Sequence, residues 1–206
     1  MSAAPGLSVR PMTAADLAAV AEVFALSFPD KLAGMLPGRT VEGARLLAQA
    51  ALESGDAWVA GDGADDGSVD GLVTFQDRKR PWYRHAHWRL VRRHVPLAAA
   101  LRAALFLVMF HVVDLPADEL YLETMAVHPR ARSRGVGGML LSFADDEARR
   151  RGRRSLSLYC ISANTRAHAL YVRCGYRDVR REDLWWCAWA LGFRFTDQMR
   201  KRLPAG

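Results

Sequence analysis

The chain has 206 residues, 50% of them hydrophobic and 25% charged, and so fits a single globular domain over residues 1–206. Its three cysteines are odd in number and lack C-x-x-C spacing, which argues against a disulfide framework or a metal site. The net charge of +7 favours an anionic partner, but charge alone does not choose between nucleic acid, a membrane surface and a phosphorylated cofactor.

The first residues contain no charged segment followed by an apolar one, so no signal peptide is expected and the predicted location is cytoplasmic. The most apolar run, residues 96–115, contains Arg102, His111 and Asp114. A buried helix explains this run better than a membrane span, which needs about 20 predominantly apolar residues. No membrane association is expected.

The N-terminal half predicts alternating helices and strands. Residues 7–10 form a short alternating segment, and Thr13 with Asp16 has the spacing of a capping box. Apolar residues 17, 20 and 24 predict a helix that ends near Pro29. Further elements are expected as a helix over 41–52, a strand over 57–60, an acidic loop over 61–67 and a returning strand over 69–76.

Residues 78–94 are basic and aromatic, and with the apolar run they predict a helical insertion over about 78–117, between the third and fourth strands. The C-terminal half predicts a strand over 120–127, helices over 138–151 and 164–173, a strand over 155–161, and two final strands over 176–203 with a loop near 181–183. This order indicates an α/β arrangement with a parallel component.

Residues 128–138, HPRARSRGVGG, connect a strand to a helix. Glycines at 135, 137 and 138 let the backbone adopt positive φ and approach a ligand, so successive amides can converge on an anion at the helix N-terminus. Arg130, Arg132 and Arg134 add positive charge where the helix dipole favours phosphate. Taken alone, the turn fits an ordinary strand-to-helix connection with solvated arginines equally well.

Residues 164–176, NTRAHALYVRCGY, predict a short helix that glycine stops before a strand. With Arg132-x-x-Gly135-x-Gly137, this segment closely resembles the GNAT superfamily of N-acetyltransferases over about residues 120–176. In that family the first motif holds the coenzyme A pyrophosphate, and the second supplies a cofactor contact and often a tyrosine acid. The resemblance implies an α/β (α+β, three-layer) fold: a mixed, mostly antiparallel sheet with a parallel splayed pair, flanked by helices.

The resemblance also implies that acetyl-CoA donates an acetyl group to a primary amine by direct attack in a ternary complex. Tyr171 is the expected acid, with a hydroxyl bound to a backbone carbonyl as the alternative. Glu123 is the expected base if its strand turns it into the cleft; otherwise it is a surface carboxylate or a substrate anchor. Asn164 contacts the pantetheine arm, caps its helix, or does both. The expected cofactor-binding residues are Met125, Ala126, Val127, Arg132, Arg134, Gly135, Val136, Gly137, Gly138, Asn164 and Tyr171.

Several alternatives remain open from the sequence. A noncatalytic acyl-CoA-binding or regulatory module is the second functional candidate, against which the presence of both Glu123 and Tyr171 counts. Nucleic-acid binding is not expected, because the arginines are dispersed and no binding motif is recognisable. A covalent cysteine route is disfavoured, since no histidine stands beside Cys160 or Cys174 in the sequence. The tryptophans of the last strands fit a homodimer interface or the core equally well. The segment 78–94 fits a solvated helix face slightly better than an acceptor pocket.

Overall fold

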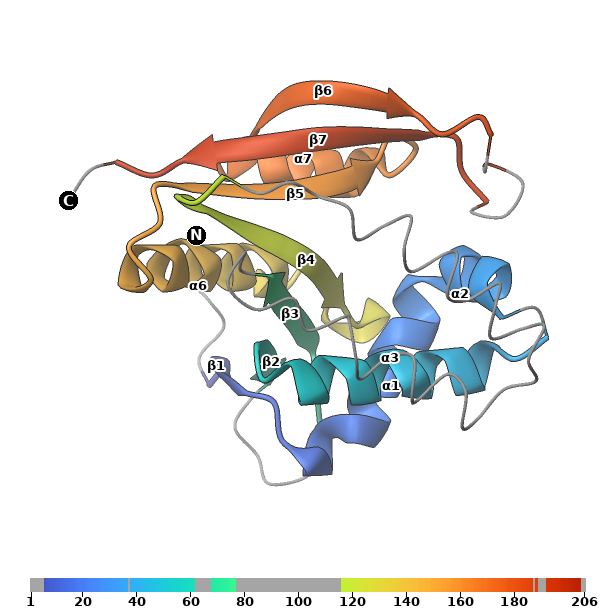
Figure 1. Cartoon of the computed structure of the whole chain (residues 1–206). Helices are drawn as coiled ribbons and strands as arrows, with labels where there is room; N and C mark the ends of the chain where they lie inside the picture. Colours follow the sequence, from blue (N-terminus) through green and yellow to red (C-terminus); the bar gives the residue numbers. More distant parts are fainter. Residues whose placement is uncertain are drawn as a thin grey trace.

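The computed structural model describes residues 6–36, 38–61, 68–76, 116–186, 188 and 192–204. Seven strands form one sheet in the order β1-β2-β3-β4-β5-β7-β6 (Figure 1). The strands are β1 Ser8–Pro11, β2 Ala57–Gly61, β3 Gly71–Gln76, β4 Glu119–Val127, β5 Ser155–Ile161, β6 Arg177–Asp183 and β7 Phe195–Arg202. The helices are α1 Leu17–Ser27, α2 Pro29–Met35, α3 Thr40–Ser54, α6 Val136–Arg150 and α7 Thr165–Arg173, with short 3-10 helices at Ala14–Asp16 and Pro129–Ala131.

All neighbouring strands pair antiparallel except β4 and β5, which are parallel. This parallel pairing joins only Glu119–Tyr121 with Ser155–Ser157. The two strands then diverge toward their C-terminal ends, as Figure 1 shows. The predicted fold class, a mixed and mostly antiparallel sheet with one splayed parallel pair, is therefore confirmed.

Two hydrophobic clusters lie on opposite faces of the sheet. The first contains buried side chains of α1, α2 and α3 together with Leu72 and Ala126. The second contains side chains of α6, α7 and the C-terminal strands, and Val127 packs against it. Successive side chains of a strand point to opposite faces, and Ala126 packs in the first cluster while the next residue, Val127, packs against the second. The two helical layers therefore lie on opposite sides of β4. Figure 1 shows α1, α2 and α3 gathered on one side.

The N-terminal helix begins where the sequence predicts it. The Asp16 carboxylate accepts hydrogen bonds from the Thr13 backbone amide at 2.8 Å and from the Arg10 guanidinium at 2.7 and 2.8 Å. The hydrogen bonds from Arg10, with those from Thr13, lower the pKa of the buried Asp16 to about 2. The helix ends at Ser27, and Pro29 then opens α2, which the sequence interpretation missed although proline at a first helical position is a start signal.

Arg151, just after the end of α6, has a structural role. Arg151 donates hydrogen bonds to Asp56 at 2.6 Å and to Glu147 at 2.6 Å, and both carboxylates are buried. Its guanidinium also lies over the Phe75 ring, 5.6 Å from the centroid. These contacts fix the C-terminal end of α6 to the turn between α3 and β2.

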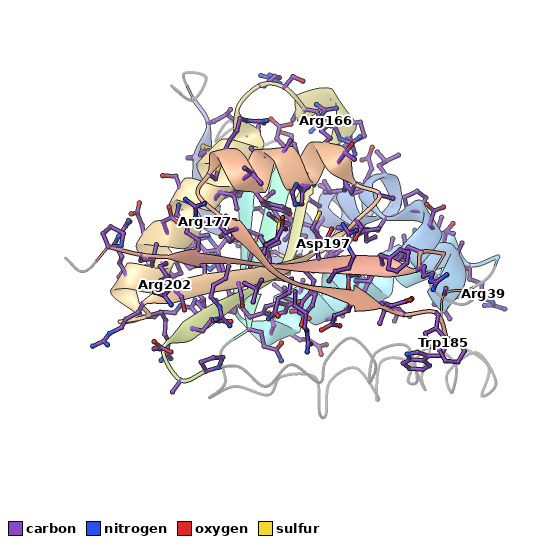
Figure 2. The ribbon with its side chains drawn as sticks, turned by 90° about the horizontal axis from the view of Figure 1, so that it is seen from above. Arg39, Arg166, Arg177, Trp185, Asp197 and Arg202 are labelled. Carbon is purple, nitrogen blue, oxygen red and sulfur yellow. The ribbon has the colours of Figure 1, made fainter. Side chains whose placement is uncertain are left out.

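The C-terminal prediction was wrong in one respect. A loop was expected near residues 181–183, but these residues are the last of β6 and pair with β7 as far as Asp183↔Phe195. The connection follows them, and Trp185 and Trp186 lie in it with 70% and 53% of their surface exposed, so neither belongs to a strand or to the core. Figure 2 shows Trp185 at the periphery of the molecule.

The segment between β3 and β4 lies where the insertion was expected, since β3 ends at Gln76 and β4 begins at Glu119. Residues 77–115, which make up nearly all of the predicted helical insertion over 78–117, fall outside the described residues, so its helical character stays a prediction. Within the described ranges, no helix is long and apolar enough to cross a membrane.

Candidate functional site

The connection between β4 and α6 forms a bend at the helix N-terminus. Ser133 and Gly135 have positive φ angles of 65° and 86°, and α6 begins at Val136, two residues before the predicted start. The first helical hydrogen bond runs from the Met139 amide to the Gly135 carbonyl at 3.0 Å. The amides of residues 136–138 therefore precede the helical hydrogen-bond ladder and, with the helix dipole, form a site suited to an anion.

The three glycines of this turn have different structural roles. Of the three, only Gly135 uses the positive φ that glycine permits, because Gly137 and Gly138 are already helical. A Cβ at Gly137 would lie 2.9 Å from the Leu170 side chain of α7, so this glycine permits close packing of the two helices. At Gly138 a Cβ would meet no atom within 4 Å.

The arginines of the turn fall into two groups. Arg130 donates a hydrogen bond to the buried Asp70 carboxylate at 3.2 Å, and this contact ties the turn to the residue before β3. Arg132 donates to the Val127 carbonyl at 3.3 Å, and neither it nor Arg134 meets a carboxylate among the described residues. Two exposed cations thus stand beside the free amides, without an acidic partner among the residues that the structure describes.

The splay exposes one edge of β4. From Leu122 to Val127 this strand pairs with β3 on one side and has no ladder partner on the β5 side within the described part of the chain. Met125, Ala126 and Val127 occupy the end of this stretch, directly before the turn. Their backbone lies at the opening between the two strands, where an extended ligand could pair with it.

Glu123 occupies a β-bulge. Phe75 pairs with Leu122 and Thr74 pairs with Thr124, so Glu123 is the extra residue of β4. A bulge re-aims a side chain and often lies beside a functional site. The half-buried Glu123 is close enough to α2 for its charge to raise the pKa of Lys31, which burial lowers more strongly.

Tyr171 comes from α7 and is buried, and its hydroxyl makes no hydrogen bond with the described part of the chain. Burial, and to a lesser extent the neighbouring Cys160, raises its pKa well above the ordinary value of a phenol. The alternative expectation, that this hydroxyl binds a backbone carbonyl, is not met within the described ranges.

Tyr121 belongs to the last parallel pair of β4 and β5, and both expected catalytic residues lie near it. Burial raises its pKa most, and Glu123, Tyr159, Tyr171 and Glu182 raise it further. The ring of Tyr121 meets the ring of Tyr159 edge-on at 6.2 Å. Glu123 and Tyr171 therefore lie around one phenol, at the point where the strands separate.

Sequence reasoning missed this cluster of polar side chains. Tyr159 donates a hydrogen bond to Glu182 at 3.1 Å, which joins β5 to β6, and Lys31 approaches from α2. The alternation of Tyr121 and Glu123 on one strand was a usable signal, because residues two apart share a face. Nothing in the sequence pattern places Lys31 or Glu182 beside them.

The remaining candidates have defined places. Asn164 caps α7, since its side-chain oxygen accepts the Ala167 amide at 3.1 Å. His168 forms an ion pair with Asp178 of β6 at 2.9 Å. Burial raises the pKa of Cys160 to about 11 and also raises that of Cys174, so both thiols stay protonated at neutral pH. No group of three His, Cys, Asp or Glu side chains in the described part of the chain could hold a metal ion.

Comparison with known proteins agrees with this geometry. Residues 39–176 match the model of the acetyltransferase (GNAT) family. The chain is 40% identical over 57 residues to an uncharacterized N-acetyltransferase, YhfO, of Bacillus subtilis, and 30% identical over 84 residues to thialysine N-epsilon-acetyltransferase of Bos taurus. These matches cover 28% and 41% of this chain, and 38% and 46% of the two relatives, so the chain spans less than half the length of each.

Solved structures share the fold over nearly the whole chain. A GCN5-related N-acetyltransferase from Kribbella flavida superposes with a TM-score of 0.61 at 22% identity, covering 96% of this chain and 98% of that one. The acetyltransferase yncA from Salmonella typhimurium, solved with its cofactor acetyl-CoA, superposes with a TM-score of 0.59 at 19% identity, covering 97% and 95%. The family match over two thirds of the sequence and the splayed sheet with its glycine turn lead to one conclusion: this chain belongs to the GNAT family of acetyltransferases.

Proposed function

We propose that this protein transfers an acetyl group from acetyl-CoA to a primary amine, by direct attack of the amine on the thioester in a ternary complex. The observation that carries the proposal is the arrangement around Tyr121, where the free phenol of Tyr171 and the bulged Glu123 lie at the opening between β4 and β5. The anion-binding turn lies at the end of the same strand.

The backbone supplies most of the proposed cofactor contacts. Amides of Val136, Gly137 and Gly138 hold the pyrophosphate, and Arg132 and Arg134 add charge beside it. The pantetheine arm extends along the free edge of β4, where the amides of residues 125–127 polarise the thioester carbonyl. The oxygen of Asn164 caps α7, so its amide nitrogen remains to donate to the pantetheine arm.

The chemical step needs two proton transfers. The amine lone pair attacks the thioester carbonyl carbon, a carbon–nitrogen bond forms, and the carbon–sulfur bond breaks as the tetrahedral intermediate collapses. The departing thiolate takes the hydroxyl proton of Tyr171, whose raised pKa keeps the phenol protonated at neutral pH. Glu123 receives the proton that the amine loses, either directly or through water.

An amine acceptor is also consistent with the relatives. The bovine relative is named for acetylation of a side-chain nitrogen, and the Bacillus subtilis relative is named an N-acetyltransferase. Nucleic acid and membrane are not among the proposed partners. A cytoplasmic location and a homodimer remain predictions.

The test compares Tyr171→Phe with the wild type in two assays. The variant should bind acetyl-CoA within about threefold of the wild type by calorimetry, because the hydroxyl is not a main cofactor contact. Its kcat for thiol release with an accepted amine should fall about 10²–10⁴-fold, the usual contribution of a positioned proton donor. Glu123→Gln should lower kcat while the cofactor still binds.

An unchanged kcat in Tyr171→Phe would remove this residue from the mechanism. Tight acetyl-CoA binding without thiol release, across a panel of small and peptide amines, would favour the noncatalytic acyl-CoA-binding module instead. Absence of acetyl-CoA binding by the wild type would refute the proposed function altogether.

A further inference from the structure

Arg166 is an exposed residue in the first turn of α7, and it contacts the anion-binding turn. Its guanidinium donates a hydrogen bond to the Ser133 hydroxyl at 3.0 Å, across 33 residues of sequence. Ser133 has a positive φ of 65° and is the only non-glycine residue with such an angle among the described residues. Figure 2 shows Arg166 at the end of α7 beside the segment that precedes α6.

The position of Arg166 relative to α6 follows from Leu170. These two residues are one helical turn apart and share a face of α7. The Leu170 side chain lies against the first turn of α6, where a Cβ on Gly137 would be 2.9 Å from it. Arg166 lies about 6 Å along the axis of α7 from Leu170, at a rise of 1.5 Å per residue, and therefore stands on the same side of α7 as the first turn of α6.

The charge of Arg166 is not neutralised by the described protein. Its one hydrogen bond goes to an uncharged hydroxyl, whereas Arg10 and Arg181 each donate twice to a carboxylate. A guanidinium has five donors, so four remain for a ligand. Through Ser133 this cation is held at the turn that carries Arg132 and Arg134, so three exposed arginines make the surface around the turn attractive to a second anionic group.

Coenzyme A carries two separate phosphate centres: the pyrophosphate and a 3′-phosphate across the ribose. The α6 amides serve the first in the proposed function, on which this inference rests. We propose that Arg166, oriented by Ser133, binds the 3′-phosphate and makes the protein prefer coenzyme A to 3′-dephospho-coenzyme A. A phosphate monoester carries a charge of about −1.5 to −2 at neutral pH and offers oxygens that match the planar guanidinium fork.

Calorimetric titrations with coenzyme A and with 3′-dephospho-coenzyme A test the proposal. The wild type should bind coenzyme A about 10–100-fold more tightly, the range expected for a charge-assisted, bidentate contact. In Arg166→Ala the affinity for coenzyme A should fall by that factor, while the affinity for the dephospho form changes less than twofold. Arg166→Lys should keep part of the preference, because a lysine holds the charge but not the fork.

Two further variants separate the contact from general charge. Ser133→Ala removes the hydrogen bond that orients Arg166, and should lower the preference for coenzyme A without abolishing it. Arg177→Ala removes the same charge from an exposed arginine of β6, at the far edge of the sheet, and should leave the preference unchanged.

Equal losses for both ligands in Arg166→Ala would overturn the proposal, since they would place the arginine at the pyrophosphate or assign it to the shape of the turn. An unchanged preference in that variant, or no preference in the wild type, would also overturn it while leaving the proposed function intact. Failure of the wild type to bind either ligand would instead reject the proposed function, and this inference with it.

Discussion

Gly135→Ala should destabilise the protein by about 1–2 kcal/mol, through backbone strain alone. Gly135 has φ 86° and ψ −6°, and an L-residue with a Cβ pays about 1–2 kcal/mol in left-handed conformations. A Cβ at this position would meet no atom within 4 Å, so no steric clash adds to the strain. For a domain of this length, about 2–4 °C is lost per kcal/mol, and Tm should fall by about 2–8 °C.

Gly138→Ala is the matched control because it adds the same methyl group three residues later. Gly138 is helical, has no positive φ, and its Cβ would also meet nothing within 4 Å. Alanine is favoured over glycine in a helix by about 0.5–1 kcal/mol, so this variant should gain about 1–4 °C in Tm. The two substitutions should therefore change stability in opposite directions.

Thermal unfolding followed by circular dichroism measures both shifts, and titration with acetyl-CoA separates stability from binding. If the turn holds the pyrophosphate as proposed, both variants should bind acetyl-CoA more weakly, because each added methyl group would lie beside the backbone amides that contact the phosphate. Equal Tm shifts in the two variants would refute the strain argument. Unchanged acetyl-CoA affinity in both would refute the placement of the pyrophosphate.

Three other substitutions test contacts described above. Asp16→Asn should lower the free energy of unfolding by about 2 kcal/mol at neutral pH, because the fold lowers the pKa of Asp16 from 3.8 to about 2. Urea titrations should show the difference between variant and wild type shrinking as the pH falls from about 4 through 2. Arg151→Met leaves the buried Asp56 without its cation and removes one of the two arginine partners of Glu147, and should cost about 3–5 kcal/mol; a loss below 1 kcal/mol would show that the ion pairs are dispensable. Cys160→Ala should keep kcat within a few-fold of the wild type, since the thiol is held protonated, and a complete loss of turnover would point to a covalent step.

Elements with strong local signals were predictable from the sequence. The strand Ser155–Ile161 matches its predicted bounds, because apolar and small residues alternate there between arginine-rich and turn-forming segments. The helix Thr165–Arg173 was expected between an asparagine cap and a terminating glycine, and it has both. The turn could be located from its glycines, and this helix from its asparagine cap and terminating glycine, because these residues determine backbone geometry locally.

Features that depend on distant partners were not predictable. A strand was expected after residue 176, but not its continuation through Asp183, because Arg177–Asp183 is mostly charged and exposed and has no apolar alternation. Pairing with β7 and the ion pair between Arg181 and Asp197 hold its last residues in place. The orientation of Glu123 depends on a bulge against Thr74 and Phe75, which lie nearly fifty residues earlier. The polar side chains around Tyr121 come from three strands and two helices, and only the folded sheet brings them together.

The short parallel pairing of β4 and β5 has a consequence for solvent exchange. Backbone amides of a strand point alternately to its two sides, and after Thr124 only the β3 side of β4 has a strand partner. Deuterium uptake along residues 124–127 should therefore alternate, with slow amides bonded to β3 and fast amides between them. An extended ligand lying in the opening would act as the missing neighbour, and the fast amides would then exchange as slowly as the others.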